Sequence, residues 1–425
     1  MLVSDEHDDA AGPKGGDRRV LLIAFHFPPD ASSTGRLRTL AFARHLRARR
    51  WKPWVLAPAP RVYERLDTQG LEDIPADVHV QRSQALDARR HLGWRGRYLS
   101  ATAIPDRWIS WYPSAVRAGL RLIRRQRIDA LWSTYPIATT HLVGASLARL
   151  SGLPWIADFR DPVVPAGTSA QKRAMRAMER WTIKRADRIV FTTPGARSRY
   201  AERFPDAANR MHVIANGFEG ETVATVPSPS RGAGGPVKLV HSGLLYREGR
   251  NPVPFFEAIA RLREASVITP DTLEVVLRAS GHEAAYAEEL ARLGIDDIVT
   301  LAPPVGYREA LAEQAGAHGL LLFQGGEFNA QIPAKVFEYL RIGRPVIALT
   351  PPDSDTAELL RTTGGALRAP IDDAEEIAAV LRDFMIRLDG DDMPEIDAKA
   401  LSGYTRKAGA MKLAGLLDEL TGIER

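Results

Sequence analysis

A lysine and a glutamate lie three residues apart at the start of one predicted helix, in the stretch IPAKVFEYL over residues 332–340. Pro333 suits the first position of a helix, where its missing N–H costs nothing. From a helix N-terminus, Lys335 could reach a phosphate group, and Glu338 could accept hydrogen bonds from the two vicinal hydroxyls of a ribose. The alternative is a surface Lys–Glu pair, which would stabilise the helix by only about 0.2–0.5 kcal/mol.

Two arginines follow a glycine in a second stretch, VHSGLLYREGRNP. Gly243 lets the chain turn at the end of an apolar strand, and Arg247 and Arg250 come just beyond it. Guanidinium groups bind phosphate oxygens in two-pronged fashion, so this pair could clamp a diphosphate. Two exposed surface arginines are the alternative interpretation.

A third stretch, HFPPDASSTGRLR, joins a strand to a helix. Its prolines stiffen the exit from the strand, and Gly35 allows close approach to the free N–H groups of the helix N-terminus, where the helix dipole favours an anion. The stretch is not the G-x-G-x-x-G dinucleotide fingerprint, so an ordinary capped turn explains it equally well.

These loops depend on the elements around them, and the first half of the chain alternates apolar strands with amphipathic helices. Strands are expected over residues 18–25, 51–58, 128–135, 154–159, 188–193 and 211–216. The order strand, loop, helix, strand is how a doubly wound parallel sheet begins. Residues 62–112 fit this pattern poorly, and we interpret them as an insertion with several exposed aromatic side chains.

The same alternation restarts in the second half, after a stretch rich in Pro, Ser and Gly. We therefore expect an α/β protein with a disordered tail (1–17), a Rossmann-like domain (18–222), a linker (223–236), a second Rossmann-like domain (237–390) and a C-terminal helical segment (391–425). In that last segment, the spacing of Leu413, Leu416, Leu417 and Leu420 suits packing on a core. Two doubly wound domains would face each other across a cleft at the carboxyl ends of their strands, where ligands bind.

The composition excludes several other classes of protein. A chain of 425 residues, 45% of them hydrophobic, suits two domains better than one core. Charged residues make up 26%, and neither a twenty-residue apolar run nor a signal-peptide pattern is present, so we expect a soluble cytoplasmic protein. The absence of cysteine excludes disulfides, thiolate metal sites and a cysteine nucleophile.

Other candidate chemistry is weaker. The sequence has no H-E-x-x-H, P-loop or G-x-S-x-G motif. Asp353 and Asp355 have the spacing of a metal-binding D-x-D loop, but Asp355 with Glu358 is typical of a helix N-cap box, and no metal site is expected. His141 lies on an apolar helix and fits a core histidine better than a base.

The net charge of +5 conceals an asymmetry. Residues 1–215 contain 36 Lys and Arg against 20 Asp and Glu, whereas the remainder contains 21 against 32. A basic half favours an anionic membrane surface or phosphates as partners. Nucleic acid is disfavoured because the arginines recur along helices without interleaved aromatic residues. Solvated helix faces remain an alternative of equal weight.

Taken together, the motifs resemble those of the family 4 retaining glycosyltransferases over roughly residues 18–385. That family has an F-P-P…G…R loop after its first strand, a D-x-R-D-P segment, a G-x-x-Y-x-x-R-N-P stretch and an IP-x-K-x-F-E-Y-L…G-R-P-V helix. The matching residues are Phe27, Pro28, Pro29, Gly35 and Arg36; Asp158, Arg160, Asp161 and Pro162; Gly243, Tyr246, Arg250, Asn251 and Pro252, with one residue of spacing allowed; and residues 332–346. The stretches ADRIVFTTPG and VIANG resemble the final strands of the family's acceptor domain.

The sequence departs from this family at two points. Many members carry two glutamates eight positions apart, and Glu338 matches the second, but Ala330 stands in place of the first. Glu327 and Gln331 are candidate substitutes. The family's lysine for the diphosphate is replaced here by Arg247 or Arg250. These departures leave the donor sugar open, more than the nucleotide.

The resemblance implies the GT-B arrangement of two Rossmann-like domains, and transfer of a hexose from a nucleoside-diphosphate sugar to an acceptor hydroxyl, with retention and without a metal or other cofactor. Arg250 with Arg247, Lys335 and the Gly35 loop would stabilise the leaving diphosphate, and Glu338 would anchor the ribose. Arg160 and Asp161 would orient the acceptor or the sugar.

The acceptor implied is a lipid-linked or saccharide molecule of cell-envelope, polysaccharide or glycolipid synthesis. It would be glycosylated by a cytoplasmic protein that is peripheral on the inner membrane face. Two alternatives stay open: a sugar-nucleotide epimerase or hydrolase of the same fold, and a non-catalytic nucleotide-sugar-binding partner.

Overall fold

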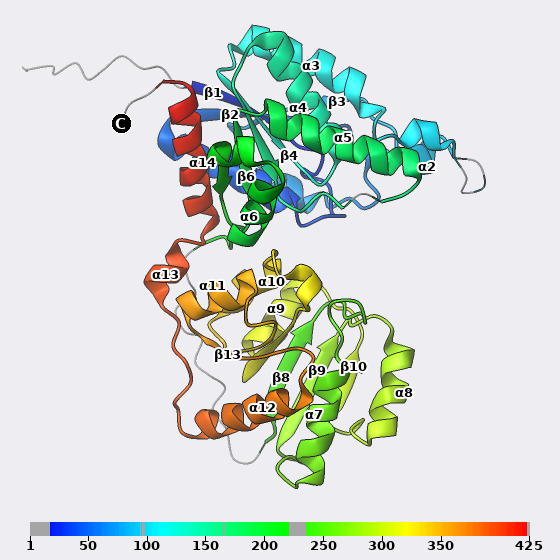
Figure 1. Cartoon of the computed structure of the whole chain (residues 1–425), viewed down its shortest axis with the longest axis vertical. Coiled ribbons are helices and arrows are strands. Elements are labelled where there is room, and N and C mark those ends of the chain that lie inside the picture. The colour runs from blue at the N-terminus through cyan, green and yellow to red at the C-terminus, as the bar shows by residue number, and fades with distance from the viewer. Residues whose placement is uncertain (1–17, 94, 96–97, 165, 221–234, 423–425) are drawn as a thin grey trace, which may run out of the picture. The chain divides into compact units, whose positions relative to one another are not determined.

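The computed structural model describes residues 18–93, 95, 98–164, 166–220 and 235–422, and contains two parallel sheets flanked by helices (Figure 1). The first has the strand order β3-β2-β1-β4-β5-β6-β7. Its strands are β1 (Arg18–Ile23), β2 (Trp51–Pro58), β3 (His79–Ser83), β4 (Ala130–Thr134), β5 (Trp155–Phe159), β6 (Arg188–Phe191) and β7 (Met211–Val213).

The second sheet has the order β10-β9-β8-β11-β12-β13. Its strands are β8 (Val237–Ser242), β9 (Leu273–Arg278), β10 (Val299–Ala302), β11 (Gly319–Phe323), β12 (Val346–Leu349) and β13 (Ala366–Ala369). Each sheet therefore reverses its strand order once, between β1 and β4 and between β8 and β11. In open α/β sheets, ligands bind at this switch point, beyond the carboxyl ends of the strands.

Helices cover both faces of the second sheet, because its strands are apolar on both sides. Leu321 and Phe323 of β11 join one core with α7 (Val253–Glu264), α8 (Glu283–Leu293) and α12 (Ala374–Asp389). Leu320 and Leu322 join the other core with α9 (Tyr307–Ala315), α10 (Ala334–Ile342) and α11 (Asp355–Thr363). The side chains alternate between faces, as the period of a strand requires.

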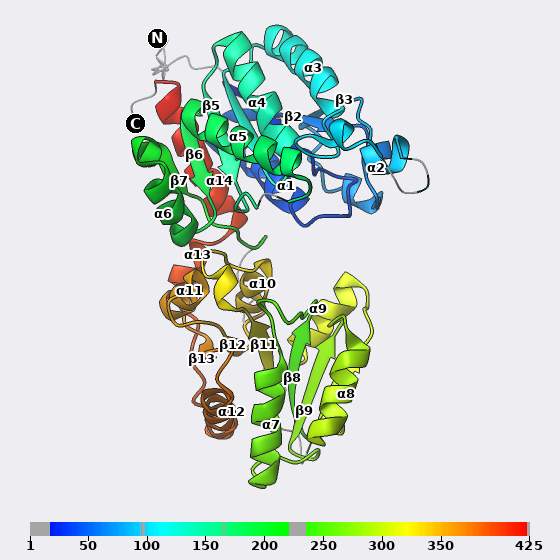
Figure 2. The same cartoon turned by 45° about the vertical axis from the view of Figure 1, so that its right-hand side comes forward.

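The first sheet carries a helical layer of its own. Helices α3 (Trp111–Gln126), α4 (Ala138–Ser151) and α5 (Ser169–Arg185) lie side by side in both views, with α4 in the middle (Figures 1 and 2). The remaining helices are α1 (Arg36–His45), the short α2 (Ala88–His91), α6 (Pro194–Arg203), α13 (Ala398–Ser402) and α14 (Arg406–Leu420). Short 3-10 turns occupy Leu46–Arg49, Pro60–Val62, Gln69–Leu71, Ser100–Ala103, Pro205–Arg210 and Gly326–Phe328.

The chain packs into two compact units. One consists of residues 1–157, 165–187 and 414–425, and the other of residues 158–164 and 188–413. The end of α14 thus returns to the first unit, where Trp51 Nε1 donates to the Asp418 carboxylate at 2.8 Å. Leu413 and Leu417 of that helix are buried. The tail (1–17) and nearly all of the linker (223–236) expected from the sequence lie outside the described residues.

The prediction of an α/β protein with two doubly wound parallel sheets is confirmed, although several details differ. Residues 62–112 contribute the edge strand β3, and two of their aromatic residues, Tyr63 and Trp111, are buried rather than exposed. The sequence interpretation overlooked β13 and α12. Pro333 is the N-cap of α10 and not its first residue, because its backbone is extended (ψ 137°). Within the described parts of the chain, no helix is long and apolar enough to span a bilayer.

Candidate functional site

The switch point of the second sheet brings together most of the residues singled out for the donor. Gly243 follows β8, and Lys335 opens α10, which is reached from the neighbouring strand β11 through the loop over residues 324–333. Because β8 and β11 are adjacent and parallel, their carboxyl-end loops lie at the same edge of the sheet.

Gly243 and Lys335 are in direct contact. Gly243 has a φ of +123°, a conformation that residues with a side chain rarely adopt, and a Cβ added there would lie 2.1 Å from Lys335 Nζ. The ammonium group therefore occupies the volume that any other residue at position 243 would fill. This contact explains why a strand-end glycine and a helix-opening lysine occur together.

A second cation lies close to this ammonium group. Arg250 has its guanidinium 5.4 Å from the Tyr246 ring centroid and 5.7 Å from that of Phe328, and its buried Nε has no hydrogen-bond partner among the described residues. Burial and the charge of Arg250 lower the pKa of Lys335 to about 8, although Glu338 opposes the shift. No carboxylate of the described chain forms an ion pair with either cation.

His241 lies beneath these cations, at the end of β8, and the sequence interpretation overlooked it. Its Nδ1 is 2.8 Å from the Leu321 carbonyl oxygen and its Nε2 is 3.1 Å from that of Gly243. Burial, reinforced by the charges of Lys335 and Arg250, lowers its pKa to about 3. The imidazole is thus neutral and donates to one of the two carbonyls. The sequence offered a single signal for this histidine. It lies in VHSG as the next-to-last residue of a buried strand.

Gln324 fixes the loop before α10. Its amide nitrogen donates to the carbonyl oxygens of Phe328 at 2.7 Å and Gln331 at 2.9 Å, while its side-chain oxygen accepts from the Thr356 hydroxyl. The Gly325 N–H also donates to the Gly249 carbonyl at 2.7 Å, which ties this loop to the one that carries Arg250. The two loops therefore hold each other in place.

Glu338 lies one turn into α10, partly buried and near enough to Lys335 to act on its charge. Ala330, which stands where the family has its first glutamate, is buried. Of the two candidate substitutes, Glu327 lies against the paired loops: its Oε2 is 2.9 Å from the position of a Cβ at Gly325 and 3.2 Å from one at Gly249. The backbone of Gln331 is held by Gln324 and Phe328.

Arg247 does not join this group. Its side chain is exposed, and the groups whose pKa values it influences are Tyr286 and Glu289, both on α8. Of the two candidate arginines, only Arg250 lies beside Lys335.

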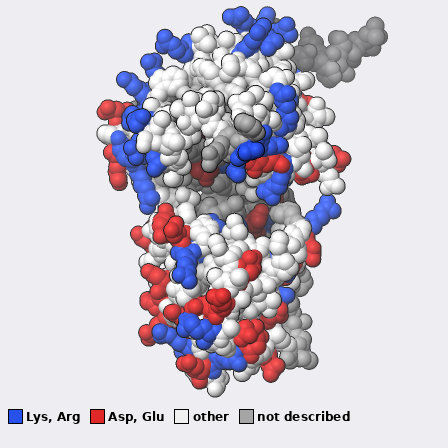
Figure 3. Space-filling model, turned by 90° about the vertical axis from the view of Figure 1, so that its right-hand side faces the viewer, with Lys and Arg blue, Asp and Glu red and all other residues white. Residues whose placement is uncertain are grey.

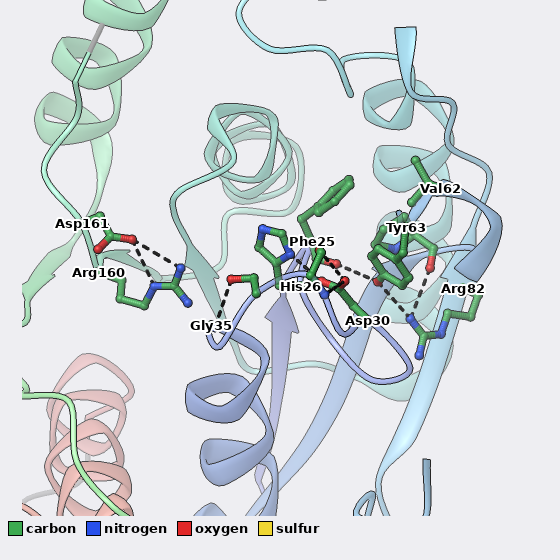
Figure 4. A network of polar contacts seen from close by, with 12 residues as sticks. Phe25, His26, Asp30, Gly35, Val62, Tyr63, Arg82, Arg160 and Asp161 are labelled. Atoms are coloured by element: carbon green, nitrogen blue, oxygen red, sulfur yellow. Dashed lines mark hydrogen bonds and ion pairs between the residues drawn. The ribbon is translucent and has the colours of Figure 1, made fainter. Parts of the chain in front are cut away.

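The remaining sequence-predicted residues lie at the strand ends of the first sheet (Figure 4). Gly35 precedes α1, and its N–H donates to the Ser33 hydroxyl at 3.1 Å, so this backbone donor is engaged within its own loop. Arg160 follows β5 and pairs with its neighbour Asp161 at 3.3 Å. Arg160 is largely buried, while about half of the Asp161 side chain is exposed (49%).

The D-x-D stretch has a structural explanation. Ser354, not Asp355, is the N-cap of α11, and its hydroxyl accepts from the Ala357 N–H at 3.0 Å. Asp353 accepts from the Asn329 side chain at 3.1 Å. The described residues contain no group of three His, Cys, Asp or Glu side chains arranged to hold a metal ion. His141 is buried and pairs with Ser133 at 2.8 Å, and burial lowers its pKa to about 3.

Residues 33–217 match the family model of the glycosyl transferase 4-like domain. The first half of this chain is thus similar to that domain. No curated protein sequence matches the chain. Three solved structures share its fold over almost the whole chain.

Sucrose-phosphate synthase from Thermosynechococcus elongatus superimposes with a TM-score of 0.61 at 14% identity, over 95% of this chain and 99% of that one. Anabaena HepE in complex with UDP-glucose gives 0.60 at 14% identity, over 94% and 99%. The N-terminal domain of Candida albicans trehalose-6-phosphate phosphatase gives 0.64 at 13% identity, over 97% and 98%. The fold is therefore that of the GT-B glycosyltransferases over almost the whole chain, and with the domain match it supports a glycosyltransferase of the GT-B type.

Proposed function

We propose that this glycosyltransferase transfers a hexose from a nucleoside diphosphate to an acceptor hydroxyl, with retention and without a metal. In this proposal Arg250 and Lys335 bind the diphosphate, Glu338 binds the ribose, and Gly243 leaves room for the Lys335 ammonium group beside them. The observation that carries the proposal is the juxtaposition of Lys335 and Arg250, two partly buried cations without an ion-pair partner in the described residues.

Such an arrangement is costly without an anion. Removing a charged group from water costs several kcal/mol unless it is paired, and here two like charges also repel each other. A bound diphosphate would pair both cations and would also offset the repulsion between them. Because its negative charge increases as the glycosidic bond breaks, these cations would stabilise the transition state more than the bound donor.

The helix beneath the site adds to this field. Lys335 is the second residue of α10, so the free N–H groups and the positive end of the helix dipole lie at the same place as the two side-chain cations. Charge neutralisation by the protein itself supports metal independence. The HepE complex with UDP-glucose makes UDP-glucose the first donor to test.

On the acceptor side, Arg160 and Asp161 would orient the acceptor or the sugar. We propose a lipid-linked or saccharide acceptor of cell-envelope, polysaccharide or glycolipid synthesis, and a cytoplasmic protein that attaches to an anionic membrane surface. The basic first half of the sequence supports this assignment.

The donor site is tested by binding. Arg250→Ala and Glu338→Ala should each weaken binding of UDP by about 1.5–3 kcal/mol, the usual loss for a hydrogen bond to a charged group, while leaving the fold intact. Isothermal titration calorimetry with UDP measures the affinity, and circular dichroism checks the fold. Arg261→Ala is the matched control, since Arg261 is an exposed arginine on α7.

Should both variants bind UDP, GDP and their glucose or mannose derivatives as tightly as the wild type, the donor assignment is wrong. Incubation with a nucleotide sugar and no acceptor separates the reaction classes, because an epimerase would convert the sugar nucleotide and a hydrolase would release free sugar rapidly.

A further inference from the structure

The ring of His241, at the switch point of the second sheet, faces a backbone carbonyl with each of its two nitrogens. Nδ1 is 2.8 Å from the carbonyl oxygen of Leu321 on β11, and Nε2 is 3.1 Å from that of Gly243 at the turn after β8. A neutral imidazole carries a single N–H, whereas an imidazolium carries two. Only the protonated ring can therefore donate to both carbonyls at once.

The neutral ring leaves one of these two contacts unfavourable. The nitrogen without a hydrogen directs its lone pair at a carbonyl oxygen, which also carries lone pairs. Because His241 is only 1% exposed, bulk water does not reach this contact to relieve it. Phe323 packs edge-on against the ring with centroids 5.1 Å apart, which holds the ring in place. The surroundings of the ring thus match the hydrogen-bonding pattern of the imidazolium.

The charges around His241 nevertheless keep the ring neutral in the protein alone. Burial disfavours the imidazolium most, and the positive charges of Lys335 on α10 and Arg250 on the turn after β8 add to this effect, so that the pKa is about 3. Also on α10, Glu338 acts on the Lys335 charge in the opposite sense, and Tyr339 stays neutral because burial raises its pKa. β11 is apolar throughout, and the residue of β9 in register with His241 is a leucine.

An anion bound to Lys335 and Arg250 would change this balance. The negative charges of a diphosphate would offset the repulsion that the two cations exert on a proton at His241, and a nearby opposite charge favours the charged form of a titratable group. The two carbonyl oxygens already in place would then each accept a hydrogen bond from the imidazolium. The ring and the diphosphate should therefore favour each other.

We propose that His241 is a positioning residue of the diphosphate site and that it takes up a proton when the diphosphate binds. The proposal rests on the proposed function and deepens it, because the ligand is the same nucleoside diphosphate. The protonated ring donates to the carbonyls of Leu321 and Gly243 together. It thereby fastens the turn that carries Arg250 to the strand that leads to α10, and so fixes both cations relative to the phosphates.

The proton comes from the solvent and returns to it when the diphosphate leaves. It binds to whichever ring nitrogen holds the lone pair, and no other bond forms or breaks in this step. By linkage, a group that binds a proton more tightly in the complex makes the ligand bind more tightly as pH falls. The proposal therefore predicts both a proton uptake and a pH dependence of affinity.

The test counts protons by isothermal titration calorimetry with UDP-glucose, in buffers of equal pH and different ionisation enthalpy. UDP-glucose is the probe because its diphosphate is esterified at both ends, and so lacks the terminal ionisation that such phosphates have near pH 6. The titrations are made at pH 5.5, where Lys335 is already protonated and takes up no further proton. The wild type is compared with His241→Gln and with His318→Asn.

His318 is the matched control because it is a partly exposed histidine of the same unit that directly precedes β11, at the opposite edge of the second sheet. Its Nδ1 accepts from the Lys238 N–H at 3.0 Å, and the side-chain oxygen of asparagine can take over this role. A difference between His241→Gln and this control reports on position 241 and not on the loss of a histidine.

We expect the wild type and His318→Asn to take up about 0.2–0.8 proton per UDP-glucose at pH 5.5, and His241→Gln to take up clearly less. The affinity of the wild type for UDP-glucose should rise by about two- to tenfold from pH 7 to pH 5. That of His241→Gln should change much less, a difference that a merely structural histidine would not produce.

A measurement on the wild type alone covers the case in which His241→Gln fails to fold. Histidine NMR spectra at pH 5.5 should show one ring that is neutral in the protein alone and becomes charged when UDP-glucose is added. Equal proton uptake by the wild type and His241→Gln, or a buried ring that stays neutral in the complex, would overturn the inference. A chain that binds no nucleotide or nucleotide sugar would overturn the proposed function itself.

Discussion

The position and the pKa of Lys335 both suit the binding of an anionic ligand. Its ammonium group lies where a side chain at Gly243 would otherwise be, and burial together with Arg250 lowers its pKa to about 8. A lysine with an unperturbed pKa near 10.4 would stay charged throughout the neutral and mildly alkaline range. Lys335 instead loses its charge near pH 8, within the pH range in which nucleotide binding can be measured.

Nucleotide affinity should therefore depend on pH in a definite direction. Below about pH 8, Lys335 is protonated and attracts the diphosphate; as pH rises through 8 the charge is lost, and affinity for UDP should fall by up to about tenfold between pH 7 and 9. The last ionisation of such phosphates has a pKa of about 6, so UDP changes its own charge little over this range. Calorimetric titration with UDP at several pH values measures the effect.

Lys335→Met is the informative comparison. It should bind UDP weakly and with little change over the same pH range, because the titrating group is gone. An affinity of the wild type that stays flat from pH 7 to 9 would show that Lys335 does not contact the diphosphate.

At the scale of elements, the two aspartates of the acidic stretch PDSDTAELL have structural roles around the start of α11. Ser354 caps the helix, and Asp355 occupies its first position, where a negative charge favours the helix dipole. Asp353 is hydrogen-bonded to Asn329 in the loop before α10. These structural roles account for both carboxylates without a metal-binding D-x-D site.

Transfer should accordingly survive excess EDTA. Initial rates with UDP-glucose, measured with and without the chelator, should agree within about twofold, since Lys335, Arg250 and the α10 dipole would neutralise the phosphates. Loss of activity with EDTA that manganese or magnesium restores would assign Asp353 and Asp355 to a metal after all.

At the scale of the whole molecule, the positive charge is concentrated on one helical layer. The only acidic residue of α3, α4 and α5 is Glu179, and it is buried, whereas the layer carries many exposed cations: Arg117, Arg121, Arg124, Arg125, Arg149, Lys172, Arg173, Arg176, Arg180, Lys184 and Arg185. Figure 3 shows Lys and Arg prevailing over the upper part of that view, and mixed charges below. The arginines after α1 differ, because Arg47 pairs with Asp77 and Arg49 with Asp418.

The layer formed by α3, α4 and α5 should therefore bind anionic lipid vesicles. Each basic side chain near such a surface contributes about 1 kcal/mol, and salt weakens the attraction because screening limits its reach to about 8 Å at physiological ionic strength. Co-sedimentation should show binding to phosphatidylserine vesicles at low salt, less at high salt, and little to neutral vesicles.

Replacing Arg121, Arg124 and Arg125 on α3 by alanine should weaken this binding by about 1 kcal/mol for each charge. The control replaces Arg261, Arg292 and Arg361 on α7, α8 and α11, which changes the net charge equally. Equal loss in both triple variants would show a response to total charge alone, and absence of binding by the wild type would return these arginines to ordinary solvated helix faces.

The sequence by itself determined the architecture, because strand and helix periods are local properties. The apolar runs predicted β2 with its observed bounds and most strands of both sheets, while β3 was missed since its edge position leaves it largely polar. The motifs around Gly243, Lys335 and Glu338 also stood out in the sequence, since turn glycines and helix starts leave local signatures.

Only the tertiary structure decided which of these residues meet. Arg247 and Arg250 are three positions apart and indistinguishable in sequence, yet packing directs one toward α8 and the other toward Lys335. Gly243 contacts Lys335 only because β8 and β11 are neighbours in the sheet. Side-chain direction and strand order depend on contacts between distant parts of the chain, and a local pattern does not contain them.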